Sequence, residues 1–263
     1  MEYRIAAHTD AGIRKRINQD SILVKVAQTD RGRICLASIC DGVGGLARGE
    51  LASATAVRYL ADWFEHAFPD LLYRGLSMET LTEQWTDMIC RINRRISTYG
   101  RMAHMDLGTT MVILLIADHT YYTANVGDSR IYLLRDELTQ LTKDQTFIQR
   151  EMDEGRMTLE EARRDSRRNL LLQCVGASEE IVPEFSSGIV VPDSIFLVCS
   201  DGFRHMVSEG EIYEYLNPRR LLREETMQEG IEYLTELDKY RKESDNISAV
   251  LVRCDQERHI CWR

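Results

Sequence analysis

The order of helix and strand signals is the feature that most constrains how this chain can fold. Two groups of strand-like segments are separated by two long amphipathic helices, so strand and helix do not alternate along the chain. Apolar residues at helical spacing predict these helices over 50–68, where Pro69 ends the pattern, and over 78–102. Before them come three apolar segments bounded by Asp, Asn or Gly, at residues 3–9, 21–28 and 32–40.

Strand signals return in the second half of the chain. Polar turns divide residues 109–142 into four strands, and antiparallel pairing of sequence neighbours is the simplest arrangement for them. A charged interval with a helical pattern follows at 144–169. The remaining segments are predicted as strands at 170–176, 182–191, 194–202 and 247–253, and as helices at 209–216 and 218–240. This order predicts an α+β protein with mostly antiparallel sheets.

Length and composition fit one domain with a large core. The chain has 263 residues, of which 44% are hydrophobic, and no repeat, low-complexity run or Pro/Ser-rich linker divides it. We therefore expect a single domain over residues 1–263, ending in a short tail at 254–263. A monomer is expected, because the sequence has no coiled-coil pattern and no obvious apolar surface strip.

The charge and the cysteines narrow the class of protein. The formal net charge is −9, which argues against a nucleic-acid partner or an anionic membrane surface, since both require a basic face. The seven cysteines form no C-x-x-C pair, and most lie in apolar runs, as expected of reduced, buried thiols. No basic leader and no apolar run of about 18 residues occurs, so we expect a cytoplasmic protein that does not span a membrane.

Aspartates lie at the ends of the apolar strands. A carboxylate beside a buried strand is partly desolvated, and a cluster of such groups repels itself unless cations are supplied. Oxygen-only ligand sets suit magnesium or manganese, and the glycine after one of these aspartates could offer its carbonyl oxygen as a further ligand. For any single Asp-Gly pair, a simple turn is the better explanation; the repeated arrangement is what favours a metal site. The aspartates are Asp20, Asp41, Asp128, Asp201 and Asp245.

A basic triplet precedes the first of these aspartates. Arg14, Lys15 and Arg16 form an "RKR" run in a chain of the opposite net charge. By charge counting alone the run is a solvated loop. Beside a metal site, one of these cations could hold the oxygens of a phosphate group.

Seven blocks in order along the chain resemble the type 2C family of metal-dependent serine/threonine protein phosphatases, in particular its single-domain bacterial members. The resemblance covers residues 9–253 and includes "TDAGIRKRINQDS", "ICDGVGGLARGELAS", "YTANVGDSRIYLLRDELTQLTKDQTF", "FLVCSDGF" and "DNISAVLV". It implies a four-layer α-β-β-α sandwich of two mostly antiparallel sheets flanked by helices. It also implies a flap at about 144–170 that borders the active site.

The resemblance assigns roles to the strand-end residues. It implies two Mn²⁺ or Mg²⁺ ions, bridged by Asp41, with the Gly42 carbonyl on one ion and Asp201 and Asp245 on the other. A third, weaker ion would lie on Asp128 with Asp201. Asp20 would position water on the metals, and Lys15 stands where the family usually has a phosphate-binding arginine, so that Arg14 or Arg16 could take over that role.

The implied reaction is hydrolysis of phosphoserine and phosphothreonine in proteins. A water between two divalent ions gives hydroxide near neutral pH without a covalent enzyme intermediate. Val43 occupies the position of a histidine proposed as general acid in animal relatives, and valine cannot donate a proton. The expected partners are a phosphorylated protein substrate and a cognate serine/threonine kinase. A catalytically silent binding module and a small-molecule phosphatase are the alternatives.

Overall fold

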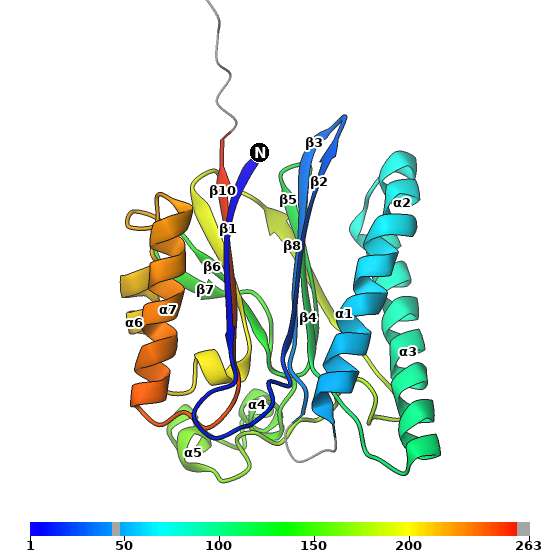
Figure 1. Cartoon of the computed structure of the whole chain (residues 1–263), viewed down its shortest axis with the longest axis vertical. Coiled ribbons are helices and arrows are strands. Elements are labelled where there is room, and N and C mark those ends of the chain that lie inside the picture. Colours follow the sequence, from blue (N-terminus) through cyan, green and yellow to red (C-terminus); the bar gives the residue numbers. More distant parts are fainter. Residues whose placement is uncertain (44–47, 257–263) are drawn as a thin grey trace, which may run out of the picture.

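Two five-stranded sheets lie face to face in the computed structural model, which describes residues 1–43 and 48–256 (Figure 1). Every pairing between the described strands is antiparallel. Sheet A has the order β1 (Glu2–Asp10), β10 (Ile247–Asp255), β9 (Ser194–Cys199), β6 (Arg130–Leu134), β7 (Leu138–Gln140). Sheet B has the order β2 (Ser21–Thr29), β3 (Gly32–Cys40), β4 (Met111–Ala117), β5 (Thr120–Val126), β8 (Glu184–Ile189).

Helices cover the outer face of each sheet, which gives four layers (Figure 1). The outer face of sheet B is covered by α1 (Gly49–His66), α2 (Phe68–Arg74) and α3 (Met78–Ala103). The outer face of sheet A is covered by α6 (Glu209–Leu216) and α7 (Glu224–Tyr240). Two short helices, α4 (Phe147–Asp153) and α5 (Leu159–Arg164), lie at one end of the sandwich. The predicted α-β-β-α sandwich is confirmed.

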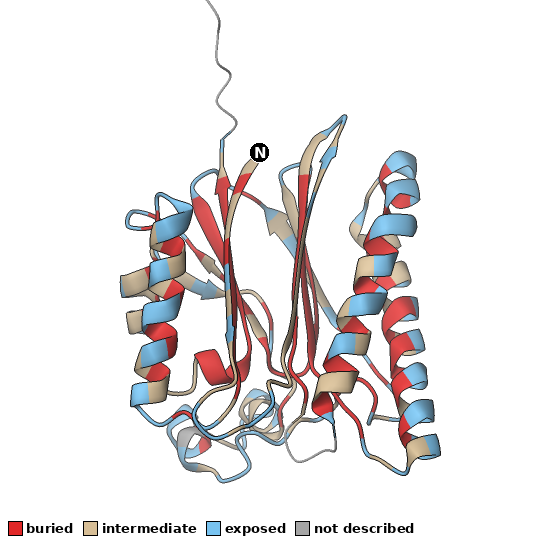
Figure 2. Cartoon of the chain, in the orientation of Figure 1, coloured by how far each residue is buried: buried red, intermediate tan, exposed pale blue. Residues whose placement is uncertain are grey.

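Three apolar layers hold these four layers together, and single strands contribute to two of them. In β3, Leu36 faces the α1–α3 helices, while its neighbours Cys35 and Ala37 face the other sheet. In β10, Leu251 packs toward α6 and α7, and Val250 packs between the sheets. Because successive side chains point to opposite faces, a strand buried on both sides reads as a continuous apolar run. Figure 2 shows this burial along the central strands.

The meander predicted for residues 109–142 is wrong at one point. Strand β5 pairs with β4 and β8, whereas β6 pairs with β7 and β9 in the other sheet. The chain therefore crosses from sheet B to sheet A between Val126 and Arg130. A short polar connection, here residues 127–129, looks the same in sequence whether it closes a hairpin or carries the chain across a sandwich.

Smaller differences concern the ends of elements. Pro69 lies in the first turn of α2, where its missing N–H is tolerated, so it starts a second helix directly after α1. Residues 170–176 form isolated bridges in place of a strand, and α7 begins at Glu224, six residues after Pro218. Strand β10 continues to Asp255, into the expected tail 254–263, of which residues 257–263 lie outside the described residues.

The described cysteines are all free thiols, and five of the six are buried. This agrees with the expectation of reduced, buried side chains. In the described part of the chain, no helix is both long and apolar enough to cross a membrane.

Asp238 on α7 provides a test of the packing against sheet A. Its side chain is fully buried, and burial, with the charge of Glu243 nearby, raises its pKa to about 8. The unfolded chain loses this proton near pH 4, whereas the folded chain keeps it to about pH 8. The free energy of unfolding therefore includes a full contribution from protonated Asp238 below about pH 4. This contribution is lost as the pH rises from about 4 to about 8.

We expect Asp238→Asn to remove this loss. The variant should have a higher melting temperature than the unsubstituted protein. The difference between the two should be at least about 3 °C larger at about pH 8 than at about pH 5.5. Thermal unfolding followed by circular dichroism measures the difference, with Asp70→Asn on exposed α2 as the control. An equal difference at both pH values would contradict a protonated Asp238.

Candidate functional site

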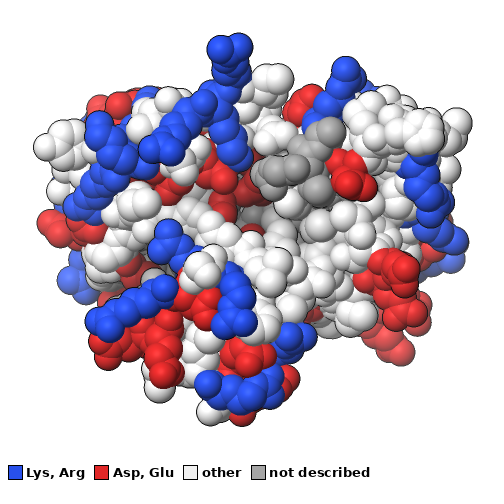
Figure 3. Space-filling view, turned by 90° about the horizontal axis from the view of Figure 1, so that it is seen from below, with Lys and Arg blue, Asp and Glu red and all other residues white. Residues whose placement is uncertain are grey.

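The strand-end aspartates meet at the end of the sandwich that carries α4 and α5. Acidic side chains gather at the centre of this end, with Lys and Arg side chains around its margin (Figure 3). The charges of Asp20, Asp128, Asp201 and Asp245 all act on Asp41 and raise its pKa, after burial, which is the larger cause. Five segments that are distant in sequence therefore form one acidic centre.

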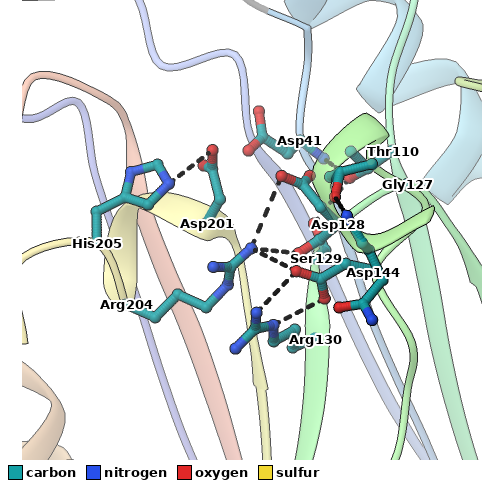
Figure 4. A network of polar contacts seen from close by, with 12 residues as sticks. Asp41, Thr110, Gly127, Asp128, Ser129, Arg130, Asp144, Asp201, Arg204 and His205 are labelled. Atoms are coloured by element: carbon teal, nitrogen blue, oxygen red, sulfur yellow. Dashed lines mark hydrogen bonds and ion pairs between the residues drawn. The ribbon is translucent and has the colours of Figure 1, made fainter. Parts of the chain in front are cut away.

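Asp41 is the most firmly held of the five. It follows directly after β3, is 7% exposed, and its backbone is fixed by three hydrogen bonds from the start of β4. Its N–H donates to Thr110 Oγ1 at 3.0 Å, and its carbonyl accepts from the Thr110 N–H at 2.8 Å and from Thr109 Oγ1 at 2.9 Å. These bonds hold the backbone of Asp41 in place, and its carboxylate lies in the acidic centre (Figure 4).

Asp20 lies beside Asp41 and is anchored by sheet A. The Ser248 hydroxyl donates to Asp20 Oδ2 at 2.6 Å, while Asp20 Oδ1 is buried with no hydrogen-bond partner among the described residues. Burial, to which the Asp201 charge adds, raises the pKa of Asp20 to about 6 in spite of the bond from Ser248. One carboxyl oxygen of Asp20 therefore accepts a hydrogen bond, and the other has no hydrogen-bond partner among the described residues.

Asp201 and Asp245 are connected through a partly buried histidine and a buried glutamate. His205 Nε2 lies 3.3 Å from Asp201 Oδ2, and His205 Nδ1 lies 3.3 Å from Glu243 Oε2. The other Glu243 oxygen accepts from the Asp245 N–H at 2.8 Å. Burial opposes ionisation of Asp201, but the nearby cations, His205 first, outweigh it and lower its pKa. Asp201 is therefore an anion, and its position is coupled to that of Asp245.

Gly42 lies where the backbone of the site is crowded. Its N–H donates to the Gln19 carbonyl at 3.1 Å, and a Cβ on Gly42 would lie 2.6 Å from the Gly49 carbonyl carbon. Gly49 lies on the other side of this contact, at the start of α1, where a Cβ would lie 2.9 Å from the Gly42 carbonyl carbon. The sequence also predicts that Gly44 and Gly45, which have no side chain to obstruct a phosphate, let the chain pass close to the site; both lie outside the described residues.

The basic triplet is divided between the site and the solvent. The Lys15 ammonium bonds Asp245 Oδ1, and its pKa, which burial lowers, is raised overall by the carboxylates of the acidic centre, Asp245 first. Arg14 and Arg16 on either side are exposed. Lys15 is thus the member of the triplet that reaches the acidic centre.

Asp128 reaches the site because the chain crosses between the sheets at this point. Gly127 has φ of 104°, a conformation that favours glycine, and both of its backbone groups bond Gln145 at 2.9 Å. The Ser129 hydroxyl bonds Thr110 Oγ1 at 2.8 Å, which ties the crossing to the start of β4. Asp128 therefore faces Asp41 and Asp201 across the end of the sandwich (Figure 4).

A pair of arginines lies on the other side of Asp128. Arg130 forms a two-pronged ion pair with Asp144, at 2.8 and 2.7 Å. Arg204 Nη2 donates to the Asp128 carbonyl at 2.8 Å and lies 3.7 Å from Asp128 Oδ2 and 3.5 Å from Asp144 Oδ2. Burial raises the pKa of Asp128 to about 7, the Asp201 charge adds to this, and Arg204 opposes it. A cation of the chain therefore lies on this carboxylate.

The donor chemistry of Asp41, Asp201 and Asp245 fits hard divalent ions. These residues offer carboxylate oxygens, Gly42 offers a carbonyl, and Asp201 Oδ1 is buried with no hydrogen-bond partner among the described residues. Within the described residues, no three His, Cys, Asp or Glu side chains are close enough to hold an ion as they stand. Two of the aspartates have a cation of the chain beside them: Lys15 pairs with Asp245, and Arg204 pairs with Asp128.

Sequence reasoning did not identify His205, Arg204, Asp144 or Glu243. Arg204 and His205 lie three and four residues after Asp201 of the "SDG" motif, and that proximity was the available signal. Asp144 and Glu243 gave no such signal, because their roles depend on partners that are 14 and 38 positions away, Arg130 and His205.

The chain is similar to known proteins over nearly its whole length. A family model described as Protein phosphatase 2C matches residues 8–240. Protein phosphatase PhpP of Streptococcus pneumoniae is 31% identical over 258 residues, which cover 96% of this chain and 98% of that protein. The serine/threonine phosphatase stp of Listeria monocytogenes is 35% identical over 223 residues, 82% of this chain and 83% of that protein.

Solved structures show the same likeness. The serine/threonine phosphatase PstP/Ppp of Mycobacterium tuberculosis superposes with a TM-score of 0.80 at 31% identity, covering 97% of this chain and 99% of that one. The PstP catalytic domain in complex with two manganese ions gives a TM-score of 0.76 at 30% identity, covering 97% of this chain and 99% of that one.

The crowding at Gly42 generates a prediction about the stability of the site. We expect Gly42→Ala to lower the free energy of unfolding by about 2 to 3 kcal/mol, because the added methyl group meets backbone atoms that cannot move aside. Gly210→Ala is the matched control: in α6 the nearest atom to its Cβ is 3.9 Å away, and helix propensity gains roughly 0.5 to 1 kcal/mol. Urea unfolding measures both, and equal stability of the two variants would refute the close contact.

Proposed function

The chain belongs to the protein phosphatase 2C family, and from this membership we propose that it hydrolyses phosphoserine and phosphothreonine in proteins with two divalent metal ions, Mn²⁺ or Mg²⁺. The observation that carries the proposal is the acidic centre itself. Asp41 is buried among the carboxylates of Asp20, Asp128, Asp201 and Asp245. Folding such a cluster is costly unless cations neutralise it.

In this proposal Asp41, the Gly42 carbonyl, Asp201 and Asp245 hold the two ions. When bound, two divalent ions would activate a water for attack near neutral pH and would offset charge on the phosphoryl oxygens, so that no covalent enzyme intermediate is needed. Asp201 is suited to the role because His205 holds one of its oxygens and leaves the other without a hydrogen-bond partner among the described residues.

Asp20 positions the attacking water. Its Oδ2 accepts a hydrogen bond from Ser248. Its Oδ1 is available to accept a hydrogen bond from a water next to Asp41. The seven cysteines take no part in the reaction. Val43 has no ionisable proton to donate, so the departing serine or threonine oxygen takes its proton from water or leaves without the help of an acid.

Lys15 is proposed as the phosphate-binding cation of the basic triplet. It is the member whose ammonium reaches the acidic centre, and it bonds Asp245 in this structure. On phosphate binding, the ammonium would exchange that carboxylate oxygen for a phosphoryl oxygen. A lysine makes a point contact and lacks the two-pronged geometry of an arginine.

The wider setting is proposed from the relatives. We infer one phosphatase domain over residues 1–263, with 144–170 as a flap that contains α4 and α5 beside the acidic centre. The substrates would be phosphorylated proteins, in keeping with relatives named serine/threonine phosphatase. We expect a monomer in the cytoplasm that opposes a serine/threonine kinase.

Removal of the metals or of Asp41 tests the reaction. We expect release of phosphate from a phosphothreonine peptide with Mn²⁺, abolition of this release by EDTA, and a loss of at least about 100-fold in kcat/KM for Asp41→Asn. Turnover of free phosphate monoesters and diesters is measured in parallel. A folded protein that binds Mn²⁺ but hydrolyses nothing would be a binding module, and a preference for free esters would identify a small-molecule phosphatase.

The basic triplet generates a second prediction. We expect Lys15→Met to lower kcat/KM about 10- to 100-fold, and Lys15→Arg to retain most of the activity, because the charge that faces the phosphate is lost only in the first. Arg14→Met and Arg16→Met are the matched controls, since their side chains are exposed. A larger loss in either control than in Lys15→Met would move the role to that arginine.

A further inference from the structure

Three cationic side chains of the chain itself lie on carboxylates of the acidic centre. These ion pairs are Lys15 with Asp245, His205 with Asp201, and Arg204 with Asp128. Each cation offsets charge that the buried carboxylates would otherwise impose on one another. The three pairs differ in how firmly the cation is held.

Arg204 is anchored on several sides. Its Nη2 donates to the Asp128 carbonyl and lies within 4 Å of the carboxylates of both Asp128 and Asp144, and its side chain is only 13% exposed. An arginine guanidinium keeps its proton at any pH at which a protein folds, and these contacts hold it from the backbone and from two carboxylates. The guanidinium is thus a fixed positive charge.

Displacement of Arg204 would leave one buried carboxylate without a cation. Asp144 would keep its pair with Arg130, but Asp128, which is 6% exposed, would keep none of the contacts described above. Lys15 differs in this respect, since its side chain is 23% exposed and Asp245 is its one ion-pair partner among the described residues. Lys15 can leave when a ligand arrives, whereas Arg204 is held by backbone and carboxylates together.

We propose that Arg204 is the permanent counter-cation of Asp128, so that this chain binds two divalent ions and does not bind a third on Asp128. This inference rests on the proposed function for the two other ions. A divalent cation on a carboxylate oxygen of Asp128 would lie next to the guanidinium, and the two like charges repel in a partly desolvated site. Arg204 would therefore take the place of a metal ion at this position.

Access does not prevent an ion from reaching Asp128. A cavity of about 630 Å³ extends from Asp128 along Arg204 and Asp144 to the inner faces of α4 and α5. Water and hydrated ions fit a cavity of this size. The local charge, and not a closed wall, decides whether a third ion binds.

The number of bound Mn²⁺ ions tests the proposal on the full chain. Equilibrium dialysis should find the same number for the unsubstituted protein and for Asp128→Asn. Arg204→Met should bind one more, and the double variant Arg204→Met/Asp128→Asn should lose that ion again. Arg204→Lys is the matched control, which keeps a charge at this position and should bind as many ions as the unsubstituted protein.

Two results would overturn the proposal: an ion in the unsubstituted protein that Asp128→Asn loses, or no additional ion in Arg204→Met. If the unsubstituted protein bound no Mn²⁺ at all, the proposed function would be refuted instead. In that event the counter-cation role is decided by thermal unfolding in EDTA, where no metal takes part.

In EDTA we expect Arg204→Met to lower the melting temperature by about 5 °C or more, because a buried carboxylate loses its partner. Adding Asp128→Asn to that variant should recover at least half of the shift, since the uncompensated charge is then gone. Additive shifts of the two substitutions would overturn the pairing. Arg74→Met, which removes an exposed ion pair on α2, controls for the loss of a surface arginine and should shift the melting temperature little.

Discussion

Mutual repulsion among buried carboxylates is the constraint on which the rest of this structure depends. Asp41 is nearly buried, and four other aspartates act on its charge from different segments. In water such groups would separate, but here the backbone holds them together: Asp41 through three bonds to the start of β4, and Asp128 through the crossing at Gly127. The free energy that this arrangement requires comes from the three apolar layers of the sandwich.

The sandwich architecture explains why the site is at one end. Asp41 follows β3 in sheet B, whereas Asp201 follows β9 and Asp245 precedes β10 in sheet A. The two antiparallel sheets present these strand ends to the same edge of the molecule, facing each other across the inner apolar layer. Neither sheet alone could surround an ion, so the site exists only where both sheets end.

Cations of the chain then divide the acidic centre into parts with different chemistry. Lys15 and His205 lie on Asp245 and Asp201, two carboxylates proposed to bind metal, and Arg204 lies on Asp128. A lysine on a partly exposed loop can exchange partners, which suits phosphate binding. A guanidinium bonded to the backbone of its own carboxylate partner cannot do so without leaving that carboxylate buried and unpaired. The acidic centre thus has two parts, which differ in the mobility of the cation. Lys15 can leave Asp245 in the proposed catalytic part, whereas Arg204 stays on Asp128.

Local patterns in the sequence determined the kinds of elements, most of their positions, and the aspartates of the acidic centre. The helices predicted at 50–68 and 78–102 correspond to α1 and α3, because helical and strand periodicity are properties of a short segment. The tertiary structure alone decided that the chain leaves sheet B after β5 and that β6 pairs in sheet A, because the packing of both sheets selects the pairing partners. It also decided which cation meets which carboxylate: Lys15 and not its neighbours, and Arg204 on Asp128 across 76 positions. Such contacts depend on distances in space, which a linear sequence with no fold specified does not contain.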